Sequence, residues 1–246
     1  MRIALLSDIH ANIDALEACL AHARDRGADS HAYLGDFVGY GAEAGAVVDV
    51  VMRAVAAGGI AVKGNHDAAI EKRDGYFQEE ARAALDLARK MLTDEQKRFL
   101  RELPLRVDRG PSCFVHATAA MPERWVYIDS PGTALDCARA SNRNYTFCGH
   151  VHDQVLYFET IAGRMSDFRP VPGTPIPMRG LRRWIALVGS VGQPRDRNPA
   201  AAYAIFDEER RELTYFRVPY DQHAAADRIR RAGLPHSLAY RIEAGF

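Results

Sequence analysis

The sequence has few cysteines, and no two of them form a CxxC pair. Cys19, Cys113, Cys137 and Cys148 are widely separated along the chain. This scarcity excludes a cysteine-based zinc ribbon and gives no sign of a disulfide framework. We therefore expect four buried free thiols, as in a protein of the reducing cytoplasm.

Long apolar runs and an excess of charge of one sign are also absent. No segment approaches the roughly 20 apolar residues that a membrane span requires, so we expect no membrane partner. Lys plus Arg total 32, as do Asp plus Glu. A neutral balance gives no general electrostatic reason to bind nucleic acid. The basic stretch "RGLRRW" at 179–184 is too short for many phosphate contacts, so we interpret it as a solvated face and expect no stable nucleic-acid partner.

The first third of the chain alternates between short apolar runs and segments with helical spacing. Strands are predicted at 2–7, 31–36 and 60–67, and helices at 12–27 and 42–59. This order is typical of a parallel α/β sheet. Further along, we expect a helical stretch near 77–102, a strand pair ending at 117, a helix at 130–141 and one or two helices in 221–243. Alternating segments after residue 152 favour antiparallel strands. Neither a repeat nor a long linker divides the chain, so we predict one domain over 1–246.

Polar residues that can bind metals follow one predicted strand after another. Ligands in open α/β sheets bind beyond the carboxyl ends of the strands, so these side chains are expected to meet. Taken singly, each motif has a plainer explanation, such as a capped turn, a tight turn or a structural histidine. The joint pattern favours a functional site, and three of its members directly follow glycines that permit close backbone approach. The set comprises Asp8, His10, Asp36, Asn65, His66, His116, His150 and His152.

The segment "FCGHVHDQV" at 147–155 places two histidines one residue apart. In an extended chain, residues i and i+2 point to the same side, so His150 and His152 would face one point. That arrangement suits a metal ion, but it also suits a chance pair on a wet surface.

The order of these motifs resembles that of the calcineurin-like metallophosphoesterases. The family pattern runs D-x-H, G-D, G-N-H-D/E, a lone His and G-H-x-H, and residues 3–152 of this chain fill every position. The stretches "SDIHANIDALEA", "GDFVGYG", "GNHDAA" and "GSVGQPRD" further resemble the small bacterial and archaeal branch of YfcE-like phosphodiesterases. The resemblance implies an α/β fold, a four-layered α-β-β-α sandwich of two mixed sheets flanked by helices.

The resemblance also implies a centre of two divalent metal ions with Asp36 as the bridging ligand. One ion would be held by Asp8, His10, Asp36 and His152, and the other by Asp36, Asn65, His116 and His150. Oxygen and imidazole donors without a thiolate suit Mn, Fe, Zn or similar ions. Two such ions favour in-line attack by a bridging hydroxide on a phosphoester. His66 would be the catalytic residue that protonates the leaving oxygen or stabilises the phosphoryl group.

The sequence departs from the family after the second strand. Many members read G-D-x-x-D-R there, whereas Gly39 and Tyr40 replace the acidic and basic residues in this chain. An Asp that would orient the catalytic His and an Arg that would grip phosphate are thus missing. Arg195 of "GSVGQPRD" is the first candidate to replace that Arg, because its fork matches two phosphate oxygens. The alternative is a solvated Arg in a tight turn.

The remaining substrate-binding candidates are Gln193, Tyr40 and Trp125. Trp125 and the nearby Tyr127 would either stack on a base or another aromatic leaving group, or cap the core.

The function predicted from these residues is a metal-dependent hydrolysis of small phosphodiesters or phosphoanhydrides, with nucleotides among the candidate substrates. A phosphomonoesterase is the nearest alternative, because it uses the same metals. A protein phosphatase fits less well without the missing Asp and Arg. A binding module that has lost catalysis is disfavoured, since the ligand set and His66 are intact. Oligomeric state is not predicted.

Overall fold

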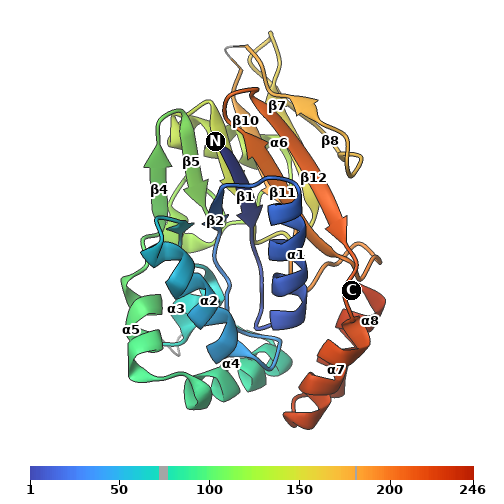
Figure 1. Cartoon of the computed structure of the whole chain (residues 1–246). Helices are drawn as coiled ribbons and strands as arrows, with labels where there is room; N and C mark the ends of the chain where they lie inside the picture. Colours follow the sequence, from blue (N-terminus) through green and yellow to red (C-terminus); the bar gives the residue numbers. More distant parts are fainter. Residues whose placement is uncertain (72–76, 181) are drawn as a thin grey trace.

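The computed structural model describes residues 1–71, 77–180 and 182–246. It consists of two six-stranded mixed sheets that pack face to face between helices, which confirms the expected α/β sandwich (Figure 1). The first sheet has, in spatial order, β3 (Ile60–Ala61), β2 (Ser30–Tyr33), β1 (Arg2–Leu6), β11 (Ala201–Asp207), β12 (Glu212–Val218) and β9 (Ile176–Pro177). The second has β4 (Arg106–Arg109), β5 (Ser112–Val115), β6 (Tyr145–Cys148), β10 (Trp184–Val188), β7 (Gln154–Glu159) and β8 (Met165–Phe168).

The parallel strands of the first third of the chain are confirmed, but the expectation of antiparallel strands after residue 152 fails for β10, which pairs parallel with β6. Strands β1, β2 and β3 are parallel, whereas β11 and β12 join them antiparallel. In the second sheet β5, β6 and β10 are parallel, and β4, β7 and β8 are antiparallel. Of these parallel strands, all but β10 are followed by predicted ligands at their carboxyl ends.

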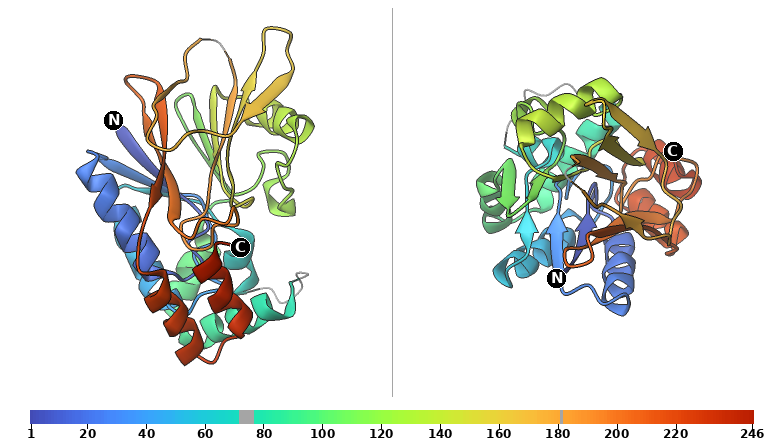
Figure 2. Two further views of the ribbon diagram at one scale, coloured as in Figure 1. Left: turned by 90° about the vertical axis from the view of Figure 1, so that its right-hand side faces the viewer. Right: turned by 90° about the horizontal axis from the view of Figure 1, so that it is seen from above.

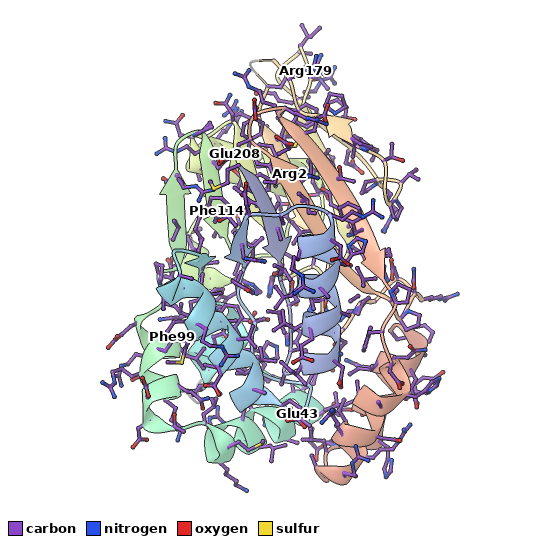
Figure 3. The ribbon with its side chains drawn as sticks, in the orientation of Figure 1. Arg2, Glu43, Phe99, Phe114, Arg179 and Glu208 are labelled. Atoms are coloured by element: carbon purple, nitrogen blue, oxygen red, sulfur yellow. The ribbon has the colours of Figure 1, made fainter. Side chains whose placement is uncertain are left out.

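Strand β1 is buried on both faces, which explains its continuous apolar run. Ile3 and Leu5 point into the layer between the sheets, together with Phe114 of β5 (Figure 3), whereas Ala4 and Leu6 pack beneath the helices. Because side chains alternate along a strand, a strand covered on both sides must be apolar throughout.

Helices cover the outer faces of both sheets. α1 (Ile13–Asp25) and α2 (Ala44–Ala56) pack on the first sheet, and α6 (Pro131–Ser141) packs on the second. The predicted helical stretch near 77–102 is two helices, α4 (Glu79–Met91) and α5 (Asp94–Glu102). They separate because Thr93 and Gln96 form a reciprocal capping box that starts α5. The tail likewise forms α7 (Gln222–Arg231) and α8 (His236–Ala244).

The two ends of the molecule differ in character. Figure 2 shows α7 and α8 beside α4 at one end, toward which the arrow of β1 points in Figure 1. Arg179 lies at the opposite end in Figure 3, and its neighbour Arg183 pairs with Glu159 at 2.6 Å. Leu181 of the same basic stretch is outside the described residues.

Among the residues described, no helix is long and apolar enough to cross a membrane. All four cysteines are buried and free, as expected.

Candidate metal centre

The loops that carry the predicted ligands have an unusual backbone. Asp8, His10, Asp36, His150 and His152 all have positive φ, between 49° and 69°. This conformation costs an L-residue roughly 1–2 kcal/mol. Strain of this kind persists where surrounding structure enforces it, and it concentrates at functional sites. Here the loops after β1 and β2 enforce it on each other, since the amide of Asp8 donates to Gly35 O at 3.1 Å and that of His10 to Asp36 O at 2.9 Å.

Asp8, His10 and His152 form one buried cluster. The Nε2 atoms of the two histidines are 3.3 Å apart, and His152 Nε2 is 3.4 Å from Asp8 Oδ1. Each ring contacts a backbone carbonyl through Nδ1, His10 at Val38 O (3.1 Å) and His152 at Gln193 O (2.6 Å). A carbonyl only accepts, so both Nδ1 atoms carry the hydrogen. In the neutral rings the two Nε2 lone pairs therefore face each other, an arrangement that a cation stabilises.

A second cluster repeats this arrangement around His116 and His150. His116 Nε2 lies 3.1 Å from His150 Nδ1 and 3.2 Å from Asn65 Oδ1. The other ring nitrogens donate to carbonyls, His116 Nδ1 to Leu34 O (2.7 Å) and His150 Nε2 to Trp125 O (2.9 Å). Hydrogen bonds of this kind fix the tautomer and orientation of metal-ligating histidines.

Asp36 joins the two clusters. Its Oδ2 is 3.4 Å from His116 Nε2, 3.7 Å from His10 Nε2 and 4.0 Å from His66 Nε2. Its ligand atoms belong to two of the three Asp/His groups that could hold a cation among the residues described. A carboxylate in this place can contact cations on both sides.

Asp67, to which the motif pattern gives no role, holds the loop of Asp36. Its carboxylate accepts hydrogen bonds from the amides of Asp36 (2.8 Å), Phe37 (2.9 Å) and Gly64 (2.9 Å). It lies at the third residue of α3 (Asn65–Ala69), where an acidic side chain caps the helix start. The final D of "GNHD" was the available signal for this role.

The "GHVH" segment is not extended, so the simple strand argument for it is wrong. β6 ends at Cys148, and both His150 (φ 66°) and His152 (φ 69°) are left-handed. Their rings consequently enter different clusters instead of facing one point. Gly149 allows the loop after β1 to approach closely, because a Cβ there would overlap Ser7 Oγ and lie 2.5 Å from Asp8 Oδ2.

The protonation states follow from burial and from the carboxylates. Burial lowers the pKa of His10 and His152 well below its usual range and that of His150 to about 3. Burial also opposes a charge on His116, but the Asp36 carboxylate outweighs it and raises the pKa of His116 to about 9. Burial raises the pKa of Asp8 to about 7. The site thus offers three neutral imidazoles with inward lone pairs, one protonated imidazole and two carboxylates. This set fits divalent cations, which would take the place of the protons on His116 and Asp8.

His66 lies at the edge of these clusters. Its amide donates to Asp36 Oδ1 at 2.9 Å, and its ring packs against His10 and Tyr40. The ring is buried, and its Nδ1 has no hydrogen-bond partner among the described residues. Gly39 stands where the motif pattern expects an Asp, and it lies so close to this nitrogen that a side chain there would meet the His66 ring.

A cavity of about 420 Å³ opens beside Asn65 and His66. Tyr40 and Arg195 line it, as do Phe77, Tyr127, Arg241 and Phe246.

The other substrate-binding candidates are placed differently. Gln193 is buried and accepts from Arg195 Nη2 at 3.2 Å through Oε1. Trp125 lines a second cavity of about 410 Å³, while Tyr127 stacks on the His150 ring at 4.1 Å. The sequence analysis did not identify Arg241, because this residue lies far along the sequence from every motif.

The comparisons with known proteins agree with this geometry. Residues 1–211 match the model of the calcineurin-like phosphoesterase superfamily domain. The chain belongs to this superfamily. Its members use divalent metal ions, and this metallophosphoesterase is a phosphoester hydrolase with Asp/His groups that could hold such ions.

Similar proteins cover almost the whole metallophosphoesterase chain. A metallophosphoesterase from Sphaerobacter thermophilus is 35% identical with a TM-score of 0.89, over 100% of this chain and 99% of its own. The protein MJ0912 of Methanocaldococcus jannaschii is 31% identical over 99% of this chain and 98% of its own length. The hypothetical protein PH1004 from Pyrococcus horikoshii, 19% identical with a TM-score of 0.79 over 100% and 98% of the two chains, shares the fold.

Proposed function

We propose that this metallophosphoesterase hydrolyses small phosphodiesters or phosphoanhydrides, nucleotides among them, with two divalent ions held by the clusters that share Asp36. The observation that carries the proposal is the set of inward-facing imidazole lone pairs on both sides of one carboxylate. When bound, such ions supply Lewis-acid stabilisation of the phosphoryl oxygens and a hydroxide nucleophile near neutral pH.

The proposed ligands keep the assignment that the motifs gave them. Asp8, His10 and His152 would hold one ion, and Asn65, His116 and His150 the other, with Asp36 in contact with both. Carbonyl acceptors on the outer nitrogens would keep each imidazole in place, so little reorganisation accompanies binding.

His66 and Arg195 would act on the substrate itself. His66 Nε2 is 4.0 Å from Asp36 Oδ2, and the ring borders the cavity, so it would donate a proton to the leaving oxygen. Arg195 enters the same cavity and would bind a non-bridging phosphate oxygen with its guanidinium. The Arg195 Nε is buried and has no partner among the described residues.

A hydrolysis screen tests the proposal. The purified enzyme, loaded in turn with Mn, Fe and Zn ions, is offered diesters, monoesters and dinucleotides, and metal content is measured by elemental analysis. We expect two ions per chain and faster cleavage of diesters or anhydrides than of monoesters. Preferential cleavage of monoesters would instead establish a phosphomonoesterase with the same centre.

His66→Ala separates binding from catalysis. Because His66 is not among the proposed ligands, the variant should retain both metal ions and lose roughly 10²–10⁴-fold in kcat, the usual contribution of general acid catalysis. His236→Ala, at the start of α8, is a matched control that should change neither quantity. A His66→Ala enzyme with an undiminished rate would remove the acid role.

A further inference from the structure

Two guanidinium groups enter the cavity beside His66 from different parts of the fold. Arg195 comes from the loop after β10, and Arg241 comes from α8. Within the described part of the chain, no carboxylate lies within 4.0 Å of either side chain, whereas Arg228 and Arg230 of the adjacent helix α7 both pair with carboxylates. Partly buried cations without a counter-ion are unfavourable, which indicates an anionic ligand for the cavity.

Arg195 lies over the Tyr40 ring, with its guanidinium carbon 5.7 Å from the ring centroid, and Arg241 lines the same cavity. The Tyr40 ring contacts His10 at 4.6 Å and His66 at 4.7 Å, and its hydroxyl is 3.5 Å from Arg195 Nη2. Burial raises the pKa of the Tyr40 phenol, and the positive charges of Arg195 and Arg241 both oppose that rise. Arg195 thus contacts the ring that packs against His66, and Arg241 lines the same cavity from α8.

Arg241 is held on a rigid support. Leu238, Ala239 and Ile242 of α8 pack into a buried cluster with α7 and with Ala84 of α4. The carbonyl of Arg241 accepts hydrogen bonds from the last two residues of the chain, which brings Phe246 onto the same cavity. Both helices lie beyond residues 1–211 that match the superfamily model, yet the Sphaerobacter thermophilus enzyme covers the whole chain. Arg241 and Phe246 therefore lie outside the part of the chain that matches the superfamily model.

We propose that Arg241 forms a second anion subsite that binds a second phosphate of the substrate, so that this enzyme prefers phosphoanhydrides to esters with a single phosphate. The proposal rests on the function proposed above. A guanidinium fork matches phosphate oxygens, and a cavity of about 420 Å³ is within the usual size of small-ligand sites. In the reaction, water oxygen bonds to the attacked phosphorus, the P–O–P bond breaks at that phosphorus, and the departing phosphate takes a proton. Arg241 would bind that departing phosphate.

Arg241→Ala and Arg241→Gln test the subsite with two substrates that differ in phosphate number. Diadenosine diphosphate carries two phosphates, and the 4-nitrophenyl ester of adenosine monophosphate carries one. A charge-assisted hydrogen bond is worth roughly 10- to 150-fold. We therefore expect kcat/KM for the two-phosphate substrate to fall by about that factor, mainly through KM, and to fall much less for the one-phosphate substrate. Arg241→Lys should recover part of the loss.

Arg231→Ala on α7, an exposed site outside the cavity, should affect neither substrate. The thermal unfolding temperature of each variant shows whether α8 still packs, and Arg241→Gln keeps most of the side-chain stem should the alanine variant unfold. Equal losses on both substrates, or a wild-type preference for the one-phosphate ester, would overturn the subsite and leave the phosphoesterase proposal standing. Cleavage of neither substrate with any metal would instead overturn the proposed function.

Discussion

Gly39→Ala probes the most sensitive contact around His66. Gly39 has φ +87°, and a Cβ at this position would lie 2.3 Å from His66 Nδ1, where ordinary contacts begin near 3.4 Å. The ring must therefore retreat by about 1 Å. It is surrounded by His10, Tyr40 and Phe77, with ring centroids 4.7–5.0 Å away, so it cannot retreat without disturbing them.

The expected effect on catalysis is larger than that on stability. A misplacement of about 1 Å can cost roughly 10²-fold in rate. The left-handed backbone alone costs alanine about 1–2 kcal/mol, which in a chain of this size lowers the unfolding temperature by only a few degrees. We expect Gly39→Ala to fold, to bind metal and to lose about 10²-fold in kcat.

Gly173→Ala is the matched control, because Gly173 has φ +80° and a Cβ at this position would meet no atom within 4 Å among the described residues. It should show the same small loss of stability with full activity. Steady-state kinetics, metal analysis and thermal unfolding on both variants give the comparison. Wild-type kcat in a folded, metal-loaded Gly39→Ala enzyme would refute the close packing of His66 as a determinant of activity.

Two further predictions concern the metal centre. His116, with a pKa raised to about 9, and Asp8, with a pKa raised to about 7, must each lose a proton when a cation binds. The affinity of the His116 cluster should therefore rise about tenfold per pH unit up to pH 9, and that of the Asp8 cluster up to pH 7. Calorimetric titrations in buffers of different ionisation enthalpy measure this proton release, and its absence would contradict these protonation states. Asp67→Asn should lower the free energy of unfolding by about 1–3 kcal/mol, because the new amide NH₂ faces a buried backbone N–H donor. The variant should also bind metal more weakly, because Asp67 holds the loop that carries Asp36. Denaturant unfolding and metal analysis check both effects, and unchanged values would mean that the Asp36 loop does not need this carboxylate.

Much of the candidate site could be predicted from local sequence because of how α/β sheets are built. The carboxyl ends of parallel strands converge at one edge, so polar residues after each apolar run had to gather there. Asp8 follows β1, Asp36 follows β2 and His116 follows β5, and the structure brings all three within one buried site. The helical tail was also visible from its spacing, although its contribution to the cavity was not.

The sequence by itself determined which donor types meet and in which layer of the fold they lie, because strand ends and apolar periodicity are local properties. Tertiary structure alone decided how the donors are oriented. The left-handed turns at His150 and His152 send two neighbouring rings into different clusters, and carbonyls from distant loops fix which nitrogen of each ring faces inward. The position of Arg241 was equally beyond local sequence, because it depends on the packing of α8 against a helix more than a hundred residues earlier in the chain.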